Sequence, residues 1–191
     1  MELVLTPDHR YILNGRHIPG TTEPLVGLGL LDTRYFTEFA RERGRAIHAA
    51  IHYHLTGGVD WATVDPRFVK YVEAALRFID DANFTPHGVE VVKASEHYGF
   101  GGTLDTYGIG FGELILPDWK SGFLGEITGL QLAAYELLLG VEARRMAVQL
   151  RPDGTYKKTD FTKRQDRPRF LGALDLYRTF IFKEGEERVA A

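Results

Sequence analysis

The sequence predicts an α/β (α+β) fold in which helices flank a central mixed β-sheet. Three observations support this prediction. Apolar residues recur at helical spacing before residue 83. Three strand-like segments follow at 89–94, 100–107 and 114–118, and then come a helix, two strands and a closing helix. The helix between the third and fourth strands can connect parallel neighbours, and helices then cover the faces of the sheet.

Composition is typical of one globular domain. The chain has 191 residues, of which 44% are hydrophobic and 26% charged. It has no cysteine, which excludes disulfides, thiolate zinc sites and iron–sulfur clusters. The net charge of −3 argues against non-specific coating of nucleic acid but permits a local basic groove. Apolar runs fall short of the roughly 18 residues of a membrane span, and signal-peptide features are missing, so we expect a cytoplasmic protein without a membrane partner.

A β-hairpin is expected at the start of the chain. Asn14-Gly15 is the strongest two-residue hairpin signal, and short apolar segments flank it. Residues 19–24 begin and end with proline and break regular structure, and residues 26–31 read as an apolar connector.

Two helical regions are expected before the strands. Asp32 or Thr33 can cap the first region. Gly44 marks a break, or a close helix contact, before a second segment at 45–55. The next helix covers 66–82, with a proline in its first turn.

The second half of the chain contains clear helix-ending and turn signals. Residues 125–139 have helical spacing, and Gly140 ends that helix. Strands at 145–151 and 156–161 flank a Pro-Asp-Gly-Thr turn, and an amphipathic helix closes the chain. We therefore expect one domain over residues 1–191, made of an N-terminal hairpin (1–24), a core (32–140) and a C-terminal hairpin and helix (144–183).

The main candidate site consists of Asp105, Asp118 and Lys120. A hairpin with a Gly-rich turn at Gly108, Gly110 and Gly112 can bring the two carboxylates together at one end of a sheet. Carboxylates bind hard cations such as Mg²⁺, and a lysine one strand step away can orient the attacking water. The alternative is that both are solvent-facing aspartates at strand ends. Gly101-Gly102, just before Asp105, lets another backbone or a substrate approach closely.

Other polar residues are spaced to join this site. Gln131 and Tyr135 lie at i and i+4 of one helix and so share a face, although a surface glutamine and a core tyrosine are an equal alternative. His48 and His52 have the same spacing, which can bind zinc. Ala49 follows His48, so the HExxH pattern is missing. We favour His48 as one ligand of a carboxylate-rich site.

Five motifs in this order resemble the PD-(D/E)XK nuclease superfamily, and most closely its RecB-like exonuclease branch with a QxxxY motif, which includes stand-alone phage members. The resemblance covers residues 44–140, and residues 11–25 also resemble the opening of phage members. The motifs are Gly44-x-x-x-His48, Glu90 before a strand, Tyr98-Gly99-Phe100-Gly101-Gly102-Thr103-Leu104-Asp105, Asp118-Trp119-Lys120-Ser121-Gly122 and Gln131-x-x-x-Tyr135.

The resemblance implies a restriction-endonuclease-like core and specific roles. His48, Asp105 and Asp118 would bind metal together with the backbone carbonyl of Trp119, and Lys120 would position or activate water. Gln131 and Tyr135 would hold the DNA strand. Glu90 would either take part directly or play a structural role, and Glu96 is expected to face solvent. Two departures are the aspartate at 118, where glutamate is as common, and the absence of the iron–sulfur cluster that some relatives carry.

The C-terminal hairpin adds candidate DNA contacts. Between Arg151 and Arg169 there are seven basic and three acidic residues, an excess suited to sequence-independent phosphate contacts. Lys157 and Lys158 are the candidates there, with Arg45 as a third on the first helical region, against the alternative of a solvated face. Tyr156 and Phe161 can stack on bases, although strand aromatics are more often core residues.

We therefore predict a DNA nuclease dependent on one or two Mg²⁺ or Mn²⁺ ions, acting as an exonuclease in DNA recombination, repair or replication. Endonuclease cleavage is the nearest alternative. A non-catalytic DNA-binding or recombination-scaffold domain on the same fold is the rival from another class, and a zinc hydrolase is a third. Expected partners are DNA, further copies of the chain, or recombination and replication proteins, in the host cytoplasm if the gene is phage-borne.

Overall fold

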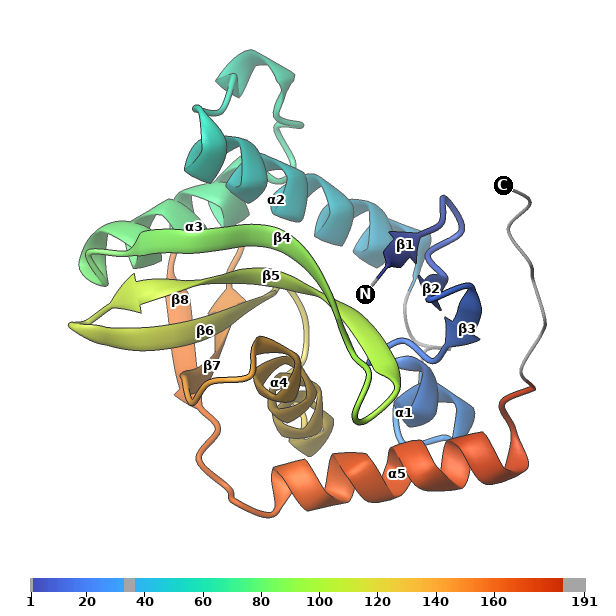
Figure 1. Cartoon of the computed structure of the whole chain (residues 1–191). Helices are drawn as coiled ribbons and strands as arrows, with labels where there is room; N and C mark the ends of the chain where they lie inside the picture. The colour runs from blue at the N-terminus through green and yellow to red at the C-terminus, as the bar shows by residue number, and fades with distance from the viewer. Residues whose placement is uncertain (1, 33–36, 184–191) are drawn as a thin grey trace.

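Five strands form the central sheet, in the order β4-β5-β6-β7-β8 (Figure 1). The structure, a computed structural model, describes residues 2–32 and 37–183. All neighbours are antiparallel except β6 and β7, which are parallel. The sheet is therefore mixed, and the predicted fold class is confirmed. The strands are β4 (Thr85–Ser95), β5 (Phe100–Gly110), β6 (Glu113–Lys120), β7 (Arg144–Leu150) and β8 (Tyr156–Asp160).

The parallel pair is joined by helix α4 (Glu126–Leu139), as predicted. Gly140 follows it with φ of 78°, the left-handed conformation that ends many helices and that glycine adopts without strain. Because β7 and β8 belong to the same sheet as β4–β6, the sheet continues beyond residue 140 into the C-terminal hairpin.

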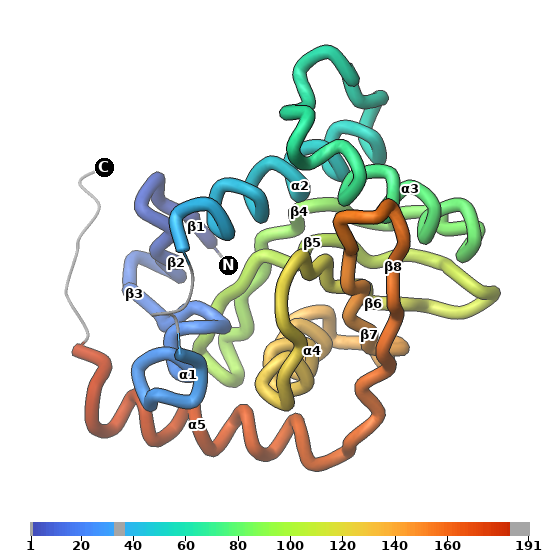
Figure 2. The backbone as a smooth tube through the Cα atoms, turned by 180° about the vertical axis from the view of Figure 1, so that it is seen from behind, coloured from blue at the N-terminus to red at the C-terminus, as the bar shows by residue number. Residues whose placement is uncertain are grey.

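Helices cover both faces of the sheet. Helices α2 (Glu38–Thr56) and α3 (Val69–Asp81) pack together, α2 against β4 and α3 against β7 and β8. Helix α4 contacts the other side and is itself covered by α5 (Asp166–Phe180), which runs along the bottom of the molecule in Figures 1 and 2. One apolar cluster lies under α2 and α3 and another under α4 and α5. No helix within the described residues combines the length and apolar character that a membrane crossing requires.

The N-terminal segment forms a separate three-stranded sheet. Its strands are β1 (Leu3–Leu5), β2 (Tyr11–Leu13) and β3 (Arg16–Ile18). Asn14 and Gly15, with φ of 50° and 76°, make the tight turn between β2 and β3, so the predicted hairpin is confirmed.

This segment packs closely against Gly101 and Gly102, the two glycines near the start of β5. The amide of Gly101 donates to the carbonyl of Pro19 across 2.9 Å, and Gly20 forms a parallel bridge with Gly101. A Cβ on Gly101 would collide with the ring of Tyr11, and one on Gly102 with the side chain of Thr21. The close neighbour is therefore the N-terminal segment of the chain itself.

Several predicted boundaries are wrong. Helix α2 passes through Gly44 without a break, and a Cβ there would meet no atom within 4 Å, so no close helix contact exists either. The cap of α2 is Thr37, whose hydroxyl accepts from the amide of Ala40, rather than Asp32; Thr33, the other expected cap, lies outside the described residues.

Three further boundaries differ from the prediction. Helix α3 begins at Val69, after a turn, and not at residue 66. The expected connector after residue 25 overlaps a short helix, α1 (Glu23–Gly27), with proline in its first turn. The turn between β5 and β6 consists of Phe111 and Gly112 alone, with φ of 54° and 81°, so Gly108 and Gly110 belong to the strand.

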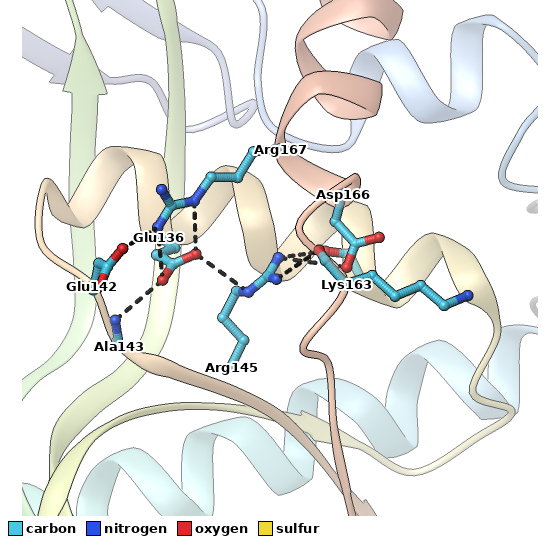
Figure 3. A network of polar contacts seen from close by, with 8 residues as sticks. Glu136, Glu142, Ala143, Arg145, Lys163, Asp166 and Arg167 are labelled. Atoms are coloured by element: carbon cyan, nitrogen blue, oxygen red, sulfur yellow. Dashed lines mark hydrogen bonds and ion pairs between the residues drawn. The ribbon is translucent and has the colours of Figure 1, made fainter.

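A buried polar network ties α5 to α4 and β7 (Figure 3). The carboxylate of Glu136 on α4 lies 3.2 Å from Nε of Arg145 on β7 and accepts from Nε of Arg167 across 3.1 Å. Arg145 also approaches Asp166 at 3.6 Å and donates to the carbonyl of Lys163. Because the Glu136, Arg145 and Asp166 side chains are all buried, each charge depends on its partners for stabilisation.

Candidate active site

Asp105 and Asp118 lie on neighbouring strands at the same level of the sheet. Strands β5 and β6 pair from Gly108–Ile115 to Gly110–Glu113, and continuing this register places Asp105 opposite Asp118. The amide of Trp119 donates to Oδ2 of Asp105 across 3.3 Å, which fixes the carboxylate against β6. The structure therefore brings together the two acids that the sequence placed in one hairpin.

His48 approaches this pair from helix α2. Its Nδ1 lies 3.4 Å from Oδ1 of Asp105, and its Nε2 lies 3.2 Å from the carbonyl oxygen of Trp119. The imidazole thus sits between the Asp105 carboxylate and the Trp119 carbonyl, both of which the resemblance implies as metal ligands. Helix α2 continues without a break through Gly44 to His48, which it brings to the carbonyl of Trp119 near the end of β6.

Lys120 connects the acids to helix α4. Its ammonium lies 2.8 Å from Oδ2 of Asp118 and 3.2 Å from the amide oxygen of Gln131. The amide nitrogen of Gln131 in turn donates to the hydroxyl of Tyr135 across 2.9 Å. The i, i+4 spacing on α4 therefore produces one continuous chain of polar contacts from Asp118 to Tyr135.

Glu90 completes a row of three acids across β4, β5 and β6. The neighbouring pairs Val89–Thr106 and Val91–Leu104 place Glu90 opposite Asp105. Glu90 has φ of 51°, an unusual conformation for a residue with a side chain, and such strain concentrates at functional sites. Ligand atoms of His48, Glu90 and Asp105 lie within 4.8 Å of one another.

The charges of the site act strongly on one another. Burial alone would lower the pKa of His48, but Asp105 and Asp118 raise it to about 9. Burial would raise the pKa of Asp105, and His48 and Lys120 nevertheless hold it below its usual value. The pKa of Asp118 is raised, by burial first and then by the charge of Asp105, against the opposing effect of Lys120. The two carboxylates therefore differ, and Asp118 lies in the less favourable environment for a negative charge.

The groups around the two acids are also shifted. Burial would lower the pKa of Lys120, but Asp118 and Asp105 together raise it. Burial raises the pKa of Tyr135 well above its usual value, so the phenol is neutral. Burial and the charge of Asp105 raise the pKa of Glu90.

A surface cavity of about 620 Å³ opens beside His48 and Glu90. It is lined by His9, Arg45, His48, His52, Tyr53 and Glu90, with Gly44 and Ala49. Arg45 thus lies on the same cavity as His48 and Glu90, and its exposed side chain is free to meet an anion there. His52 lines the cavity but does not belong to the cluster of possible ligands found among the described residues. A zinc site built on His48 and His52 has no support in this arrangement.

The structure separates the two candidate lysines of β8. Register places Lys120, Gln149 and Lys157 side by side across β6, β7 and β8, so their side chains share a face of the sheet. Lys158 lies on the opposite face, with its ammonium 4.0 Å from the centre of the Phe111 ring. Only Lys157 therefore shares the sheet face of Lys120.

Tyr156, Phe161 and Glu96 make contacts within the protein away from the acids. Tyr156 packs edge-on against Phe78 and donates to the carboxylate of Asp81, and Phe161 packs against the core under α4 and α5. Glu96 accepts from the side chain of Asn14 on the N-terminal hairpin.

Several residues near the site were not found by sequence reasoning. The hydroxyl of Tyr11 lies 2.9 Å from that of Thr103, which brings the N-terminal sheet to the strand that bears Asp105. Arg43 of α2 donates to the hydroxyl of Ser121, and Gln149 of β7 donates to the carbonyl of Gly122. These contacts join segments that are far apart in the chain, so the local sequence does not indicate them. Phe123, in the same loop as Ser121 and Gly122, did carry a local signal, because a bulky apolar side chain is unusual in a short segment bounded by glycines.

Comparison of the chain with models of known protein families and with curated proteins finds no match. The case for a function therefore depends on the geometry of the site.

Proposed function

We propose that the chain is a metal-dependent DNA nuclease that hydrolyses phosphodiester bonds. The observation that carries the proposal is the convergence of His48 from α2, Asp105 from β5, and Asp118 and Lys120 from β6. The Gln131–Tyr135 pair extends the same set of contacts along α4. Resemblance to the RecB-like branch of the PD-(D/E)XK superfamily points to the same activity, with the same residues in the same order.

The donor set fits a hard divalent cation. Carboxylate and carbonyl oxygens with one imidazole suit Mg²⁺ or Mn²⁺. Oδ2 of Asp118 is buried and has no aligned hydrogen-bond partner among the described residues, although Lys120 lies close to it. Two neighbouring buried carboxylates repel each other unless a positive charge compensates them. His48, Asp105, Asp118 and the Trp119 carbonyl would hold one ion, and Glu90 extends the ligand set toward a second.

The imidazole of His48 supplies a second observation in favour of a cation. It contacts both the Asp105 carboxylate and the Trp119 carbonyl, and its raised pKa of about 9 makes it positively charged at neutral pH. A positive charge is thus already favoured between these two oxygens. Binding of an ion to the same oxygens requires His48 to lose a proton and act as a neutral ligand.

The chemistry of hydrolysis divides between the ion and the side chains. When bound, a divalent cation lowers the pKa of a coordinated water and neutralises charge on the phosphate. Lys120, fixed between Asp118 and Gln131, presents its ammonium where it can hold the attacking water and a phosphate oxygen. The attacking water gives up one proton as its oxygen bonds to phosphorus, the bond to the leaving sugar oxygen breaks, and that oxygen takes up one proton.

Gln131 and Tyr135 hold Lys120 in place, and the half-buried Gln131 borders the path of the strand. The amide of Gln131 accepts from Lys120 at one end and donates to Tyr135 at the other. Tyr135 is buried and neutral, and so it adds no charge that would repel a phosphate. Arg45 at the neighbouring cavity and Lys157 on β8 supply positive charge on either side of the acids.

Digestion of end-labelled linear DNA with Mg²⁺ or Mn²⁺ tests the proposal. We expect the parent chain to release labelled products, and Asp118→Asn and Lys120→Ala each to lower the rate at least about a hundred-fold, as loss of groups that act in the transition state does. The exposed Lys70→Ala, on α3, serves as a charge-matched control for Lys120→Ala and should keep parental activity. Equal rates for all variants would refute the site. Covalently closed circular DNA in the same assay separates endonuclease from exonuclease cleavage, and DNA binding without metal binding or cleavage would favour a scaffold role.

A further inference from the structure

Phe123 is an outlier on the surface of the molecule. It is 91% exposed, more than any other large hydrophobic side chain among the described residues. Contact with water is unfavourable for a phenyl ring, so a flat apolar group that packs on it gains free energy by removing that surface from water. A Cβ on Gly125, two residues on, would touch the ring at 3.4 Å.

The loop that carries Phe123 begins directly after Lys120 and is fixed at its base. Nε of Arg43 on α2 donates to the hydroxyl of Ser121 across 3.1 Å. Nε2 of Gln149 on β7 donates to the carbonyl oxygen of Gly122 across 2.8 Å. Two elements on different sides of the site thus hold the residues just before Phe123, so the ring projects from an anchored loop.

Two lysines on the neighbouring sheet, Lys120 and Lys157, supply positive charge near this loop. Lys120 pairs with Gln149, and Gln149 with Lys157, so the two lysines are separated by two strand spacings, or roughly 10 Å. Lys157 is exposed, and it shares a sheet face with Lys120. The anchored loop therefore places an uncovered ring near the row defined by Lys120 and Lys157. Nucleic acid combines flat apolar bases with a charged backbone, and single-strand-binding sites pair aromatic rings with cations in this way.

We propose that Phe123 stacks on an unpaired nucleobase of the strand being cleaved, while Lys157 contacts a phosphate of the same strand. The proposal rests on the nuclease function proposed above and names its substrate form, a single-stranded or frayed DNA end. In an intact duplex both faces of each internal base are covered by neighbouring bases. A protruding phenyl ring therefore gains most from a base that has left the stack.

Binding of a fluorescein-labelled dT12 oligonucleotide, measured by fluorescence anisotropy with Ca²⁺ in place of Mg²⁺, tests this proposal. Stacking on one base is worth about 1–3 kcal/mol, so Phe123→Ala should weaken binding at least about five-fold. Phe123→Trp should restore it, because the larger ring also stacks. Binding to a blunt 12-base-pair duplex should change less than about two-fold in either variant.

A matched control and a direct signal complete the experiment. Phe180→Ala removes another exposed ring, 76% exposed, from the end of α5 and should leave dT12 binding unchanged. The indole of the Phe123→Trp variant should be quenched by dT12 beyond any change in the parent, which has tryptophan at 61 and 119.

Three results would overturn the proposal. Parental dT12 affinity in Phe123→Ala, in a parent that cleaves DNA, would refute the stacking role and leave the nuclease function standing. A change in oligomeric state of Phe123→Ala, with dT12 affinity unchanged, would assign the ring to contact between copies of the chain instead. A parent that neither binds nor cleaves DNA would refute both proposals together.

Discussion

The ammonium of Lys120 lies 3.2 Å from the amide oxygen of Gln131, and this contact joins the β6 motif to the α4 motif. Ten residues separate the two in sequence, including the whole loop between strand and helix. The contact gives Gln131 a positioning role, because an amide that accepts from Lys120 restricts where the ammonium can point. Tyr135 fixes the other end of the same amide.

Removing the hydroxyl of Tyr135 should therefore slow catalysis without unfolding the protein. In Tyr135→Phe the amide of Gln131 loses its partner and can rotate away from Lys120. We expect kcat to fall about ten-fold and the free energy of unfolding to fall by about 1 kcal/mol, the usual contribution of one hydrogen bond. Initial rates on labelled DNA and urea unfolding measure the two effects. An unchanged kcat would show that the pair does not position Lys120.

Glu90 should contribute to metal binding. Its carboxylate lies in the cluster with His48 and Asp105, and its strained backbone holds it there. Glu90→Gln should weaken Mn²⁺ binding at least about ten-fold in calorimetry, because a charged ligand is lost. Glu96→Gln is the matched control, because Glu96 accepts a hydrogen bond from the side chain of Asn14 on the N-terminal hairpin. This variant should bind Mn²⁺ with the affinity of the parent. Equal affinities for both variants would give Glu90 a structural role.

The contact between Arg144 and Asp160 should make a small, pH-dependent contribution to stability. Arg144 donates to both oxygens of Asp160, each across 2.8 Å. Hydrogen bonding to Arg144 lowers the pKa of Asp160 below the unfolded value of 3.8. The folded state therefore binds the proton less tightly than the unfolded state. The stabilisation is present above about pH 4 and is lost as pH falls through the lowered pKa.

Asp160→Asn should therefore lower the free energy of unfolding at pH 7 by up to about 1 kcal/mol, a modest value because both side chains are partly exposed. The difference from the parent should shrink as pH falls below about 4. Urea unfolding at pH 7 and at a series of lower pH values measures it, with Asp175→Asn, an exposed residue of α5, as the control. A difference that stays the same throughout the acid range would show that the contribution does not come from the charged carboxylate.

Loss of Arg145 should destabilise the fold strongly. Its guanidinium lies between Glu136 and Asp166, and both carboxylates are buried. In Arg145→Ala these charges lose a partner, which costs about 3–5 kcal/mol in buried ion pairs. Urea unfolding checks the loss, and Arg151→Ala, an exposed arginine next to the β7–β8 turn, should change stability by less than about 0.5 kcal/mol. Similar values for both would mean that the network in Figure 3 contributes little.

Local signals in the sequence were sufficient for much of the fold. Asn14-Gly15 predicted its hairpin because few residues other than asparagine and glycine accept positive φ at both turn positions. Gly140 predicted the end of α4 for a related reason. The i, i+4 pair Gln131–Tyr135 predicted a shared helix face, because helical geometry alone sets that relation.

Features that depend on tertiary contacts could not be predicted in the same way. Glycine is a poor helix former, yet Gly44 continues α2, because packing of the helix outweighs a propensity of about 1 kcal/mol. The sequence treated Lys157 and Lys158 alike, and only the register of β8 assigns them to opposite faces. Glu90 required both that register and a positive φ to reach His48, and neither is visible from its neighbours in the sequence.

The central claim is most directly tested by titrating Mn²⁺ into the metal-free parent chain while following both metal binding and the rate of DNA cleavage. The site of His48, Asp105 and Asp118 predicts that cleavage is absent without metal and rises with occupancy. Lys120→Met should bind the metal but cleave at least about a hundred-fold more slowly. Cleavage that persists after removal of divalent cations, or that Lys120→Met leaves unchanged, would contradict the claim.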